Sequence, residues 1–255
     1  SRIVATNDTT EIWLGVTTGG TFNVARKEIY LKALVSGAEW SVTRTVLLDN
    51  GHSNISQEVF HDYAWGTEKI GATMGYGGSD PQTATYTYYS STSDNNNYTQ
   101  LKSVESSDGS WTRYDAYDAA GRLKVVTTPF KSAAVTAASN TCRQTFLYYP
   151  GDAILSTLNF PADDVAVTND ARARLVVETA LGYEVARAYH AYLSDRQVSK
   201  QCRTSGAAYD STNNLSTTTY FFTNGAFMGR VYKVEHSDGT LSTAGYGYDA
   251  TSGQF

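Results

Sequence analysis

The chain has 255 residues, of which 41% are hydrophobic and 18% are charged, and its formal net charge is −5. A chain of this length can bury a core without disulfide bonds, and its composition excludes a collagen, a coiled coil and a strongly charged disordered tail. The acidic balance argues against a nucleic-acid-binding protein or a partner of anionic membranes, because both need a basic surface. No apolar run approaches the roughly 20 residues of a membrane-spanning helix, so we expect no membrane insertion.

Tyrosine stands out in the composition, with 19 residues. Tyrosine favours strands because its ring fits a pleated, half-buried surface while its hydroxyl reaches water. The tyrosines of this chain lie among Thr, Ser, Val and Gly, which are typical of strands and the turns between them. We therefore predict an all-β fold, an antiparallel sheet of repeated β-hairpins, in a single domain over residues 1–255.

Taken from the N-terminus, short runs of β-branched and aromatic residues bounded by turn-forming residues predict strands. They cover residues 11–16, 21–35, 85–89 and 217–222. Glycines at 19, 20 and 37 are expected to interrupt the first two. Two stretches rich in Ser, Thr, Asn and Ala, residues 79–100 and 131–141, predict loops, and residues 161–173 are the best candidate for a helical turn.

The clearest internal repeat relates residues 104–110 to residues 234–240. Each copy contains Asp-Gly, a strong hairpin signal, because a two-residue type I′ turn needs positive φ at both of its positions. With Asp108 and Gly109 as the two turn residues, Ser106 is predicted to pair with Trp111. Val104 and Trp111 then share one face of the sheet.

The second copy, with its turn at Asp238 and Gly239, places Val234 and Leu241 on one face in the same way. Weaker copies of the turn occur at Leu181-Gly182 and at Asn50-Gly51. The strand after the latter is expected to run through Val59 and Phe60 to Tyr63. The spacing of the four turns is irregular, which favours two hairpins per interval over a strict solenoid.

A Tyr-Asp-Ala-Ala-Gly-Arg run at residues 117–122, preceded by Asp108-Gly109 and followed by Leu123, resembles the YD repeat of the Rhs family. Tyr248-Asp249 with Gly253 is similar but has Gln254 in place of the arginine, and Tyr209-Asp210 is a degenerate copy. The resemblance covers most of residues 101–255. The residues that define the repeat are Asp108, Gly109, Tyr117, Asp118, Gly121, Arg122, Asp238, Gly239, Tyr248 and Asp249.

This resemblance implies a long β-sheet that spirals into a hollow shell, in secreted bacterial proteins whose repeats enclose a C-terminal toxin. Related repeats occur in insecticidal toxin complexes and in teneurins, which are adhesion proteins of animal cell surfaces. It therefore implies a secreted or cell-surface structural module without catalysis. Its partners would be the rest of its own polypeptide or neighbouring copies, joined through open sheet edges, and a toxin cargo, a glycan or a cell-surface protein.

A repeat array exposes an open sheet edge wherever the repeats stop, because each hairpin needs a neighbour to continue the sheet. The sequence stops within a Tyr-Asp unit. We therefore expect these 255 residues to be part of a longer polypeptide.

The sequence offers little catalytic chemistry. Its histidines, His52, His61, His190 and His236, lack the spacing of a metal site and are predicted to lie on strand surfaces. The aspartates Asp62, Asp115, Asp118 and Asp249 can be imagined as paired carboxylates, but a turn role explains the aspartate of a Tyr-Asp unit. We expect neither enzymatic activity nor a cofactor or metal.

Two further questions stay open in the sequence. Cys142 and Cys202 are either two free thiols or a single long-loop disulfide. Trp40, Trp65 and Trp111, together with exposed tyrosines, either pack within the sheet or form stacking platforms for a carbohydrate or a protein. The latter is the alternative function, an adhesion module.

Overall fold

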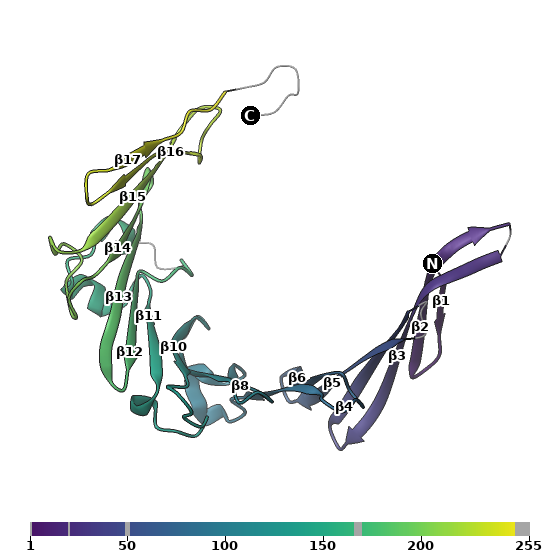
Figure 1. Ribbon diagram of the computed structural model, residues 1–255. Coiled ribbons are helices and arrows are strands. Elements are labelled where there is room, and N and C mark those ends of the chain that lie inside the picture. Colours follow the sequence, from purple (N-terminus) through teal and green to yellow (C-terminus); the bar gives the residue numbers. More distant parts are fainter. Residues whose placement is uncertain (1, 20, 49–51, 166–169, 248–255) are drawn as a thin grey trace. The chain divides into compact units, whose positions relative to one another are not determined.

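The computed structural model describes residues 2–19, 21–48, 52–165 and 170–247. The chain is 54% strand and 7% helix, and its 17 strands form one antiparallel sheet that is not closed (Figure 1). The predicted all-β fold of antiparallel hairpins is confirmed. The chain divides into two compact units, Ser1–Tyr117 and Asp118–Phe255.

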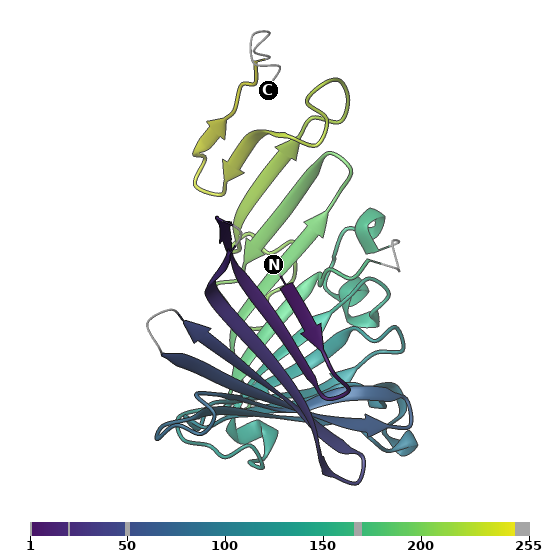
Figure 2. The same ribbon diagram turned by 90° about the vertical axis from the view of Figure 1, so that its right-hand side faces the viewer.

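In the first unit every strand pairs with the next along the chain (Figure 1 and Figure 2). The strands are β1 (Arg2–Ala5), β2 (Thr9–Thr18), β3 (Thr21–Ser36), β4 (Glu39–Leu48), β5 (Ser53–Tyr63), β6 (Gly66–Met74), β7 (Gln82–Tyr88), β8 (Leu101–Ser106) and β9 (Trp111–Tyr117). A 3₁₀ helix, η1 (Thr92–Asn97), precedes β8. The predicted strands over 11–16 and 21–35 are confirmed, and β3 ends just before Gly37.

This first unit has almost no hydrophobic interior. Among its described side chains, the buried hydrophobic ones are Val46 and Trp111. The sheet is therefore stabilised by its backbone ladder and by contacts between side chains of neighbouring strands. Trp40 of β4, for example, stacks on Phe60 of β5 with ring centroids 4.5 Å apart, and the ammonium of Lys32 lies 4.0 Å from the Trp40 ring.

The second unit continues the hairpin pattern, again with each strand beside the next. Its strands are β10 (Leu123–Thr128), β11 (Arg143–Tyr148), β12 (Leu175–Ala180), β13 (Tyr183–Tyr192), β14 (Arg196–Gln201), β15 (Leu215–Phe221), β16 (Val231–His236) and β17 (Leu241–Thr243). Its helical turns are η2 (Ser139–Thr141), α1 (Ala153–Thr157) and α2 (Ala162–Val165). In the described part of the chain, no helix is long and apolar enough to cross a membrane.

The second unit does contain a hydrophobic core. The segment between β11 and β12 carries α1 and α2 and contributes two buried apolar side chains to a cluster with residues of the sheet and with Tyr209 of the loop between β14 and β15. The buried members are Leu155, Phe160, Leu175, Val177, Tyr189, Ala191, Val198 and Tyr209. The helical turn predicted within 161–173 is present as α2, whereas α1 was not predicted.

The loop predictions are confirmed in part. Residues 131–141 contain no strand and end in η2. The strand predicted over 85–89 is confirmed as β7, which begins earlier, so the loop predicted over 79–100 is interrupted at residues 82–88, where alternating Thr and Tyr side chains belong to a strand paired with β6 and β8. The Asn50-Gly51 turn lies outside the described residues, but β5 does run through Val59 and Phe60 to Tyr63.

The hairpin between β12 and β13 turns at Leu181 and Gly182, where the sequence has a weaker copy of the hairpin turn, and this turn has two residues. Ala180 lies directly opposite Tyr183, and the two residues between them, Leu181 and Gly182, have φ of 54° and 80°. A type I′ turn requires these left-handed conformations. Leucine adopts them only with strain, because its Cβ approaches the following carbonyl oxygen.

Replacing Leu181 by asparagine is expected to raise the free energy of unfolding by about 1 kcal/mol, because asparagine tolerates the left-handed region. Leu181 is 46% exposed, so little hydrophobic contact is lost. Urea unfolding of the whole chain measures the change. Leu241→Asn is the control, since Leu241 is 61% exposed and has no positive φ. Equal stability of the two variants would contradict the strain at Leu181.

Candidate functional site

The repeated Asp-Gly hairpin between β8 and β9 has a three-residue loop. Glu105 lies opposite Trp111, the Ser106 amide donates to the Ser110 carbonyl over 2.8 Å, and the Gly109 amide donates to the Ser106 carbonyl over 3.0 Å. Gly109 has φ of 84°, and Asp108 has no positive φ. This is the common three-residue hairpin loop, a turn followed by one residue in the left-handed conformation, here Gly109. The predicted two-residue turn at Asp108 and Gly109 is therefore wrong.

The extra loop residue shifts the register and reverses the predicted faces. Because Trp111 lies opposite Glu105 rather than Ser106, Val104 and Trp111 occupy opposite faces of the sheet. The second copy repeats the correction, since Glu235 lies opposite Leu241 and so Val234 and Leu241 are on opposite faces. The predicted faces are wrong in both copies for one reason, which is that both hairpins have a three-residue loop.

The aspartate of each loop is bonded to the residue after the glycine. Asp108 Oδ1 accepts from the Ser110 amide over 2.9 Å and from the Ser110 hydroxyl over 2.7 Å. Asp238 Oδ1 accepts from the amide and hydroxyl of Thr240 at the same two distances, 2.9 and 2.7 Å. The hydroxyl bonds, followed by the amide bonds, lower the pKa of both carboxyls. This position is Ser110 in one copy and Thr240 in the other, and either side chain supplies the hydroxyl.

The Tyr-Asp run forms a loop of the same kind. The Asp118 amide donates to the Arg122 carbonyl over 3.0 Å, the Gly121 amide donates to the Asp118 carbonyl over 2.9 Å, and Gly121 has φ of 75°. Asp118 Oδ1 accepts from the amides of Ala120 and Arg122, both over 2.9 Å. The predicted turn role of Asp118 is confirmed.

Arg122 adds a second contact to this loop. Its Nε donates to Asp118 Oδ2 over 2.7 Å, so the carboxylate is bonded through both oxygens. Burial by itself would raise the pKa of Asp118, but the hydrogen bonds from Arg122 and Ala120 hold it below its ordinary value. The arginine of the motif therefore keeps the loop's carboxylate ionised and oriented.

Tyr117 anchors its hairpin through its hydroxyl. The hydroxyl donates to the carbonyl of Leu101, the first residue of β8, over 2.8 Å, and burial raises the pKa of Tyr117 to about 12. In the second copy the Tyr246 hydroxyl donates to the carbonyl of Val231, the first residue of β16, also over 2.8 Å. Tyr246 was missed in the sequence, where Tyr248 and Asp249 were singled out.

Tyr248 and Asp249 lie outside the described residues. The signal that identifies Tyr246 is its distance along the chain from the start of its hairpin. Tyr246 follows Val231 by 15 residues, and Tyr117 follows Leu101 by 16.

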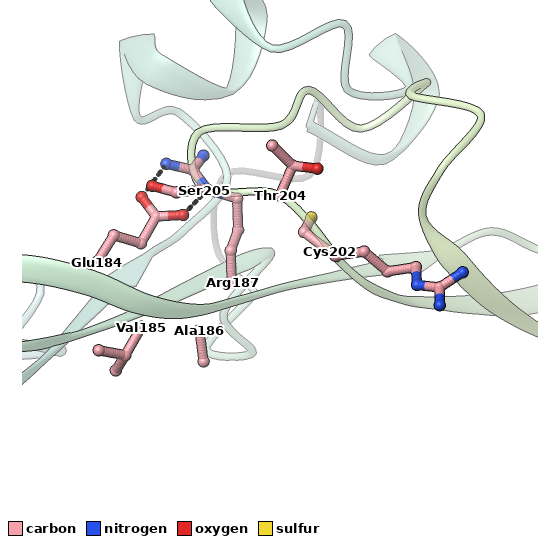
Figure 3. A pocket seen from close by; sticks show the side chains of 8 residues that line it. Glu184, Val185, Ala186, Arg187, Cys202, Thr204 and Ser205 are labelled. Carbon is pink, nitrogen blue, oxygen red and sulfur yellow. Dashed lines mark hydrogen bonds and ion pairs between the residues drawn. The ribbon is translucent and has the colours of Figure 1, made fainter.

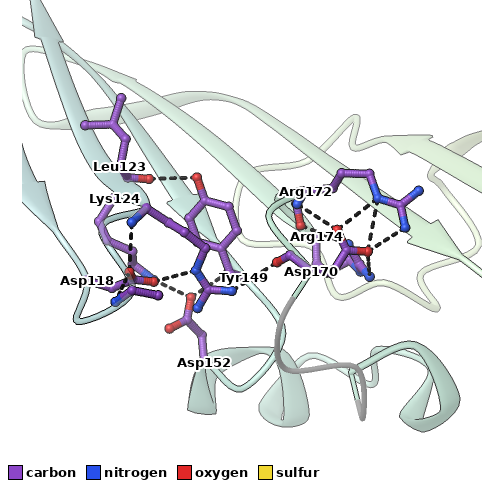
Figure 4. A network of polar contacts seen from close by, with 10 residues as sticks. Asp118, Leu123, Lys124, Tyr149, Asp152, Asp170, Arg172 and Arg174 are labelled. Atoms are coloured by element: carbon purple, nitrogen blue, oxygen red, sulfur yellow. Dashed lines mark hydrogen bonds and ion pairs between the residues drawn. The ribbon is translucent and has the colours of Figure 1, made fainter.

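A third tyrosine makes the same bond without a Tyr-Asp sequence. The Tyr149 hydroxyl donates over 2.8 Å to the carbonyl of Leu123, the first residue of β10 (Figure 4). The guanidinium of Arg122 lies 4.6 Å from the Tyr149 ring, so the loop arginine also covers the anchor. We call Tyr117, Tyr149 and Tyr246 the tyrosine anchors, because each hydroxyl bonds the start of the first strand of its own hairpin.

A buried ionic network holds the segment that precedes β12 (Figure 4). The Arg174 side chain is 1% exposed and donates to Asp164 over 2.6 Å, to Asp170 over 2.9 Å and to the Arg172 carbonyl over 2.8 Å. The bonds from Arg172, followed by those from Arg174, lower the pKa of Asp170 despite its burial. Removing one partner of such a buried pair costs about 3–5 kcal/mol, so these charged groups have a structural role.

The tryptophans proposed as binding platforms have partners within the sheet. Trp111 is 7% exposed, so the prediction that it forms an accessible stacking platform is wrong. Trp65 is half-buried and stacks on Tyr63 with ring centroids 4.3 Å apart and planes 9° apart. The ring of Trp40 is also half-buried, and Phe60 and the Lys32 ammonium both contact it.

A small polar cavity of about 60 Å³ lies between β13 and the segment after β14 (Figure 3). Arg187 donates to Glu184 through two bonds of 2.9 and 2.8 Å, and Glu184 also accepts from the Gly206 amide over 2.9 Å. Val185 and Ala186 point to the opposite side. Glu184 and Arg187 are therefore paired with each other, and the volume of the cavity suits a few water molecules.

Both cysteines are free thiols. Cys142 precedes β11 and Cys202 follows β14, so three spacings between strands, about 14 Å in all, separate them across the sheet. A disulfide requires Cα atoms within about 7 Å, and the disulfide alternative is wrong. Burial raises the pKa of the Cys202 thiol, which lies beside the polar cavity.

The other aspartates and histidines considered in the sequence bond to neighbouring side chains and do not form a cluster with one another. Asp62 accepts from the Trp40 ring nitrogen over 3.3 Å and from the Thr67 hydroxyl over 2.5 Å, and Asp115 pairs with Arg113. The rings of His190 and His236 are within hydrogen-bond distance of Ser199 and Thr217, respectively. In the part of the chain that the structure describes, no group of three or more Asp, Glu, His or Cys side chains is placed so that it could hold a metal ion.

No protein-family model matches the chain, and no curated protein matches it. The relation to the YD-repeat family therefore remains a resemblance carried by the loops and tyrosines described above.

Removing the hydroxyl of a tyrosine anchor is expected to destabilise its hairpin. Tyr117→Phe and Tyr246→Phe should each lower the free energy of unfolding by about 1 kcal/mol, because a strand carbonyl loses its donor. Tyr86→Phe is the matched control, since Tyr86 is also a half-buried strand tyrosine and its hydroxyl has no hydrogen bond within the described residues. Urea unfolding compares them. A loss at Tyr117 no larger than that at Tyr86 would refute the anchoring role.

His190 is expected to make stability depend on pH. Burial lowers its pKa below the ordinary value of 6.5, so the unfolded chain takes up a proton before the folded chain does. Stability is then fully present above pH 6.5 and is lost progressively as the pH falls from 6.5 to the lower pKa of the folded protein. His190→Gln should reduce the difference in unfolding free energy between about pH 7.5 and pH 5.5. An identical difference in both proteins would contradict this.

Proposed function

We propose that this chain is a non-catalytic structural module of a secreted or cell-surface protein of the YD-repeat kind. It forms part of a β-shell or fibre that encloses a cargo such as a toxin or displays a surface. Its partners are the rest of its own polypeptide or neighbouring copies, met through open sheet edges.

The observation that supports this proposal most directly is that one hairpin unit recurs with the same bonds. In both copies the loop glycine has φ of 84°, and the loop aspartate bonds a hydroxyl residue at 2.9 and 2.7 Å. In both copies a tyrosine hydroxyl bonds the start of the hairpin at 2.8 Å. A unit that specifies its own turn, register and closure can be repeated to extend a sheet by two strands at a time.

Each part of the Tyr-Asp motif also has a bonding role that serves the sheet. The aspartate closes the loop, the glycine supplies the left-handed residue, and Arg122 fixes the aspartate and covers Tyr149. The Asp118 carboxylate and the Arg122 guanidinium are therefore both bonded within the sheet. They favour a structural interpretation of the motif over a catalytic one.

The adhesion alternative receives less support from the aromatic side chains. Trp111 is buried, and the rings of Trp40 and Trp65 already stack on Phe60 and Tyr63. A carbohydrate platform needs an aromatic face that a sugar ring can cover. These contacts favour packing within the sheet as the role of the three tryptophans.

Limited proteolysis of the natural polypeptide, followed by mass spectrometry and negative-stain electron microscopy, tests the proposal. The expected product is a protease-resistant particle or fibre that contains this chain and keeps another segment or polypeptide bound to it. Release of the chain as a lone protease-sensitive monomer would count against a shell or fibre. The double variant Tyr117→Phe, Tyr246→Phe is the control, and its particle should be digested at a lower urea concentration.

A further inference from the structure

The loop between β15 and β16 contains Asn224 followed directly by Gly225. Asparagine before glycine is chemically labile, because the amide nitrogen of the glycine can attack the side-chain carbon of the asparagine, and glycine has no Cβ to hinder that approach. The sequence has a second Asn-Gly pair at residues 50 and 51, which lies outside the described residues. The structure therefore bears on the pair at residues 224 and 225.

Both reacting groups of this pair are open to attack. Asn224 and Gly225 are exposed, and a Cβ added to Gly225 would have no atom within 4 Å. Within the described residues, neither the Asn224 side chain nor the Gly225 amide makes a hydrogen bond. The loop holds Gly225 by its carbonyl instead, which accepts from the Met228 amide over 3.2 Å. Since the reacting atoms belong to adjacent residues, no other element has to move.

The Asp-Gly loops of the repeat differ from this pair because they bond both groups. The Gly109 amide donates to the Ser106 carbonyl over 3.0 Å, and Asp108 Oδ1 accepts from the Ser110 amide over 2.9 Å. The Ser110 hydroxyl, followed by its amide, lowers the pKa of Asp108. An ionised, bonded carboxylate is a poor target for attack, and the second Asp-Gly loop has the same bonds. We therefore expect both Asp-Gly loops to stay intact where Asn224 reacts.

The Asn-Gly pair also lies between two rings that pack on a tyrosine anchor. Phe222 precedes the pair and Phe227 follows it, and their ring centroids are 6.2 and 5.6 Å from that of Tyr246. The Gly229 amide donates to the Phe222 carbonyl over 2.8 Å and closes the loop. A longer backbone inside this closed loop would change how the two rings contact Tyr246.

We propose that Asn224 is a site of spontaneous deamidation and that its product loosens the Tyr246 anchor. The Gly225 nitrogen forms a bond to the side-chain carbon of Asn224. The side-chain nitrogen takes the proton of the Gly225 amide and leaves as ammonia. Water then opens the resulting succinimide ring at either of its carbonyls and gives aspartate or isoaspartate. Both products add one negative charge, and isoaspartate also lengthens the backbone by one carbon atom.

Incubation of the whole chain at pH 8 and 37 °C, followed by mass spectrometry of tryptic peptides, tests the site. Trypsin should release residues 204–230 as one peptide, which contains both Asn214 and Asn224. We expect Asn224 to deamidate at least tenfold faster than Asn214, which is buried and donates to the carbonyls of Ala208 and Tyr209. Asn224→Gln should abolish the reaction at this position, because glutamine would have to close a slower six-membered ring.

The same incubation in urea separates the effect of the loop from that of the sequence. Because the folded loop leaves the pair open, the rate at Asn224 in the folded chain should be within tenfold of the rate in urea. Asn214 is the internal control, and its rate should fall more than tenfold on folding. A rate at Asn224 that is more than tenfold slower in the folded chain than in urea would overturn the proposal.

Urea unfolding tests the effect on the anchor. Anion-exchange chromatography separates the deamidated chains, and the isoaspartate form should unfold at a lower urea concentration than the unmodified chain. Asn224→Asp is the matched control, since it adds the charge without lengthening the backbone, and should unfold like the unmodified chain. In a Tyr246→Phe background the isoaspartate should cause a smaller loss, because the anchor bond is already absent. Equal unfolding of the isoaspartate form and the unmodified chain would refute the loosening of Tyr246.

Discussion

A hydrogen bond from the Gly109 amide to the Ser106 carbonyl sets where the first repeated hairpin turns, and the rest of the repeat depends on that position. Because the loop holds three residues, the strands meet in the register that places Glu105 opposite Trp111. The same register brings the Tyr117 hydroxyl to the start of β8. Loop, register and anchor are therefore one mechanical unit, and its recurrence at Gly239 and Tyr246 gives this chain its repeating character.

The two units stabilise their parts of the single sheet by different contacts. The first has almost no buried hydrophobic side chains and relies on cross-strand contacts, in which rings stack on rings and cations lie over them. The second places the segment with α1 and α2 against its sheet and gains a core around Leu155 and Tyr189. Arg174 fixes that segment through buried ion pairs with Asp164 and Asp170, so their loss would weaken the hold of this segment on the core.

The sequence by itself determined the all-β class, the main strand runs, the glycines that end them and the turn role of Asp118, because these depend on local conformational preference. It also located the repeat, though it chose Tyr248 and Asp249 where the structure describes an anchor at Tyr246. Only the tertiary structure decided the loop length, the faces of Val104 and Trp111 and the burial of Trp111. The physical reason is that register is set by bonds between two strands, and a shift of one residue reverses every face.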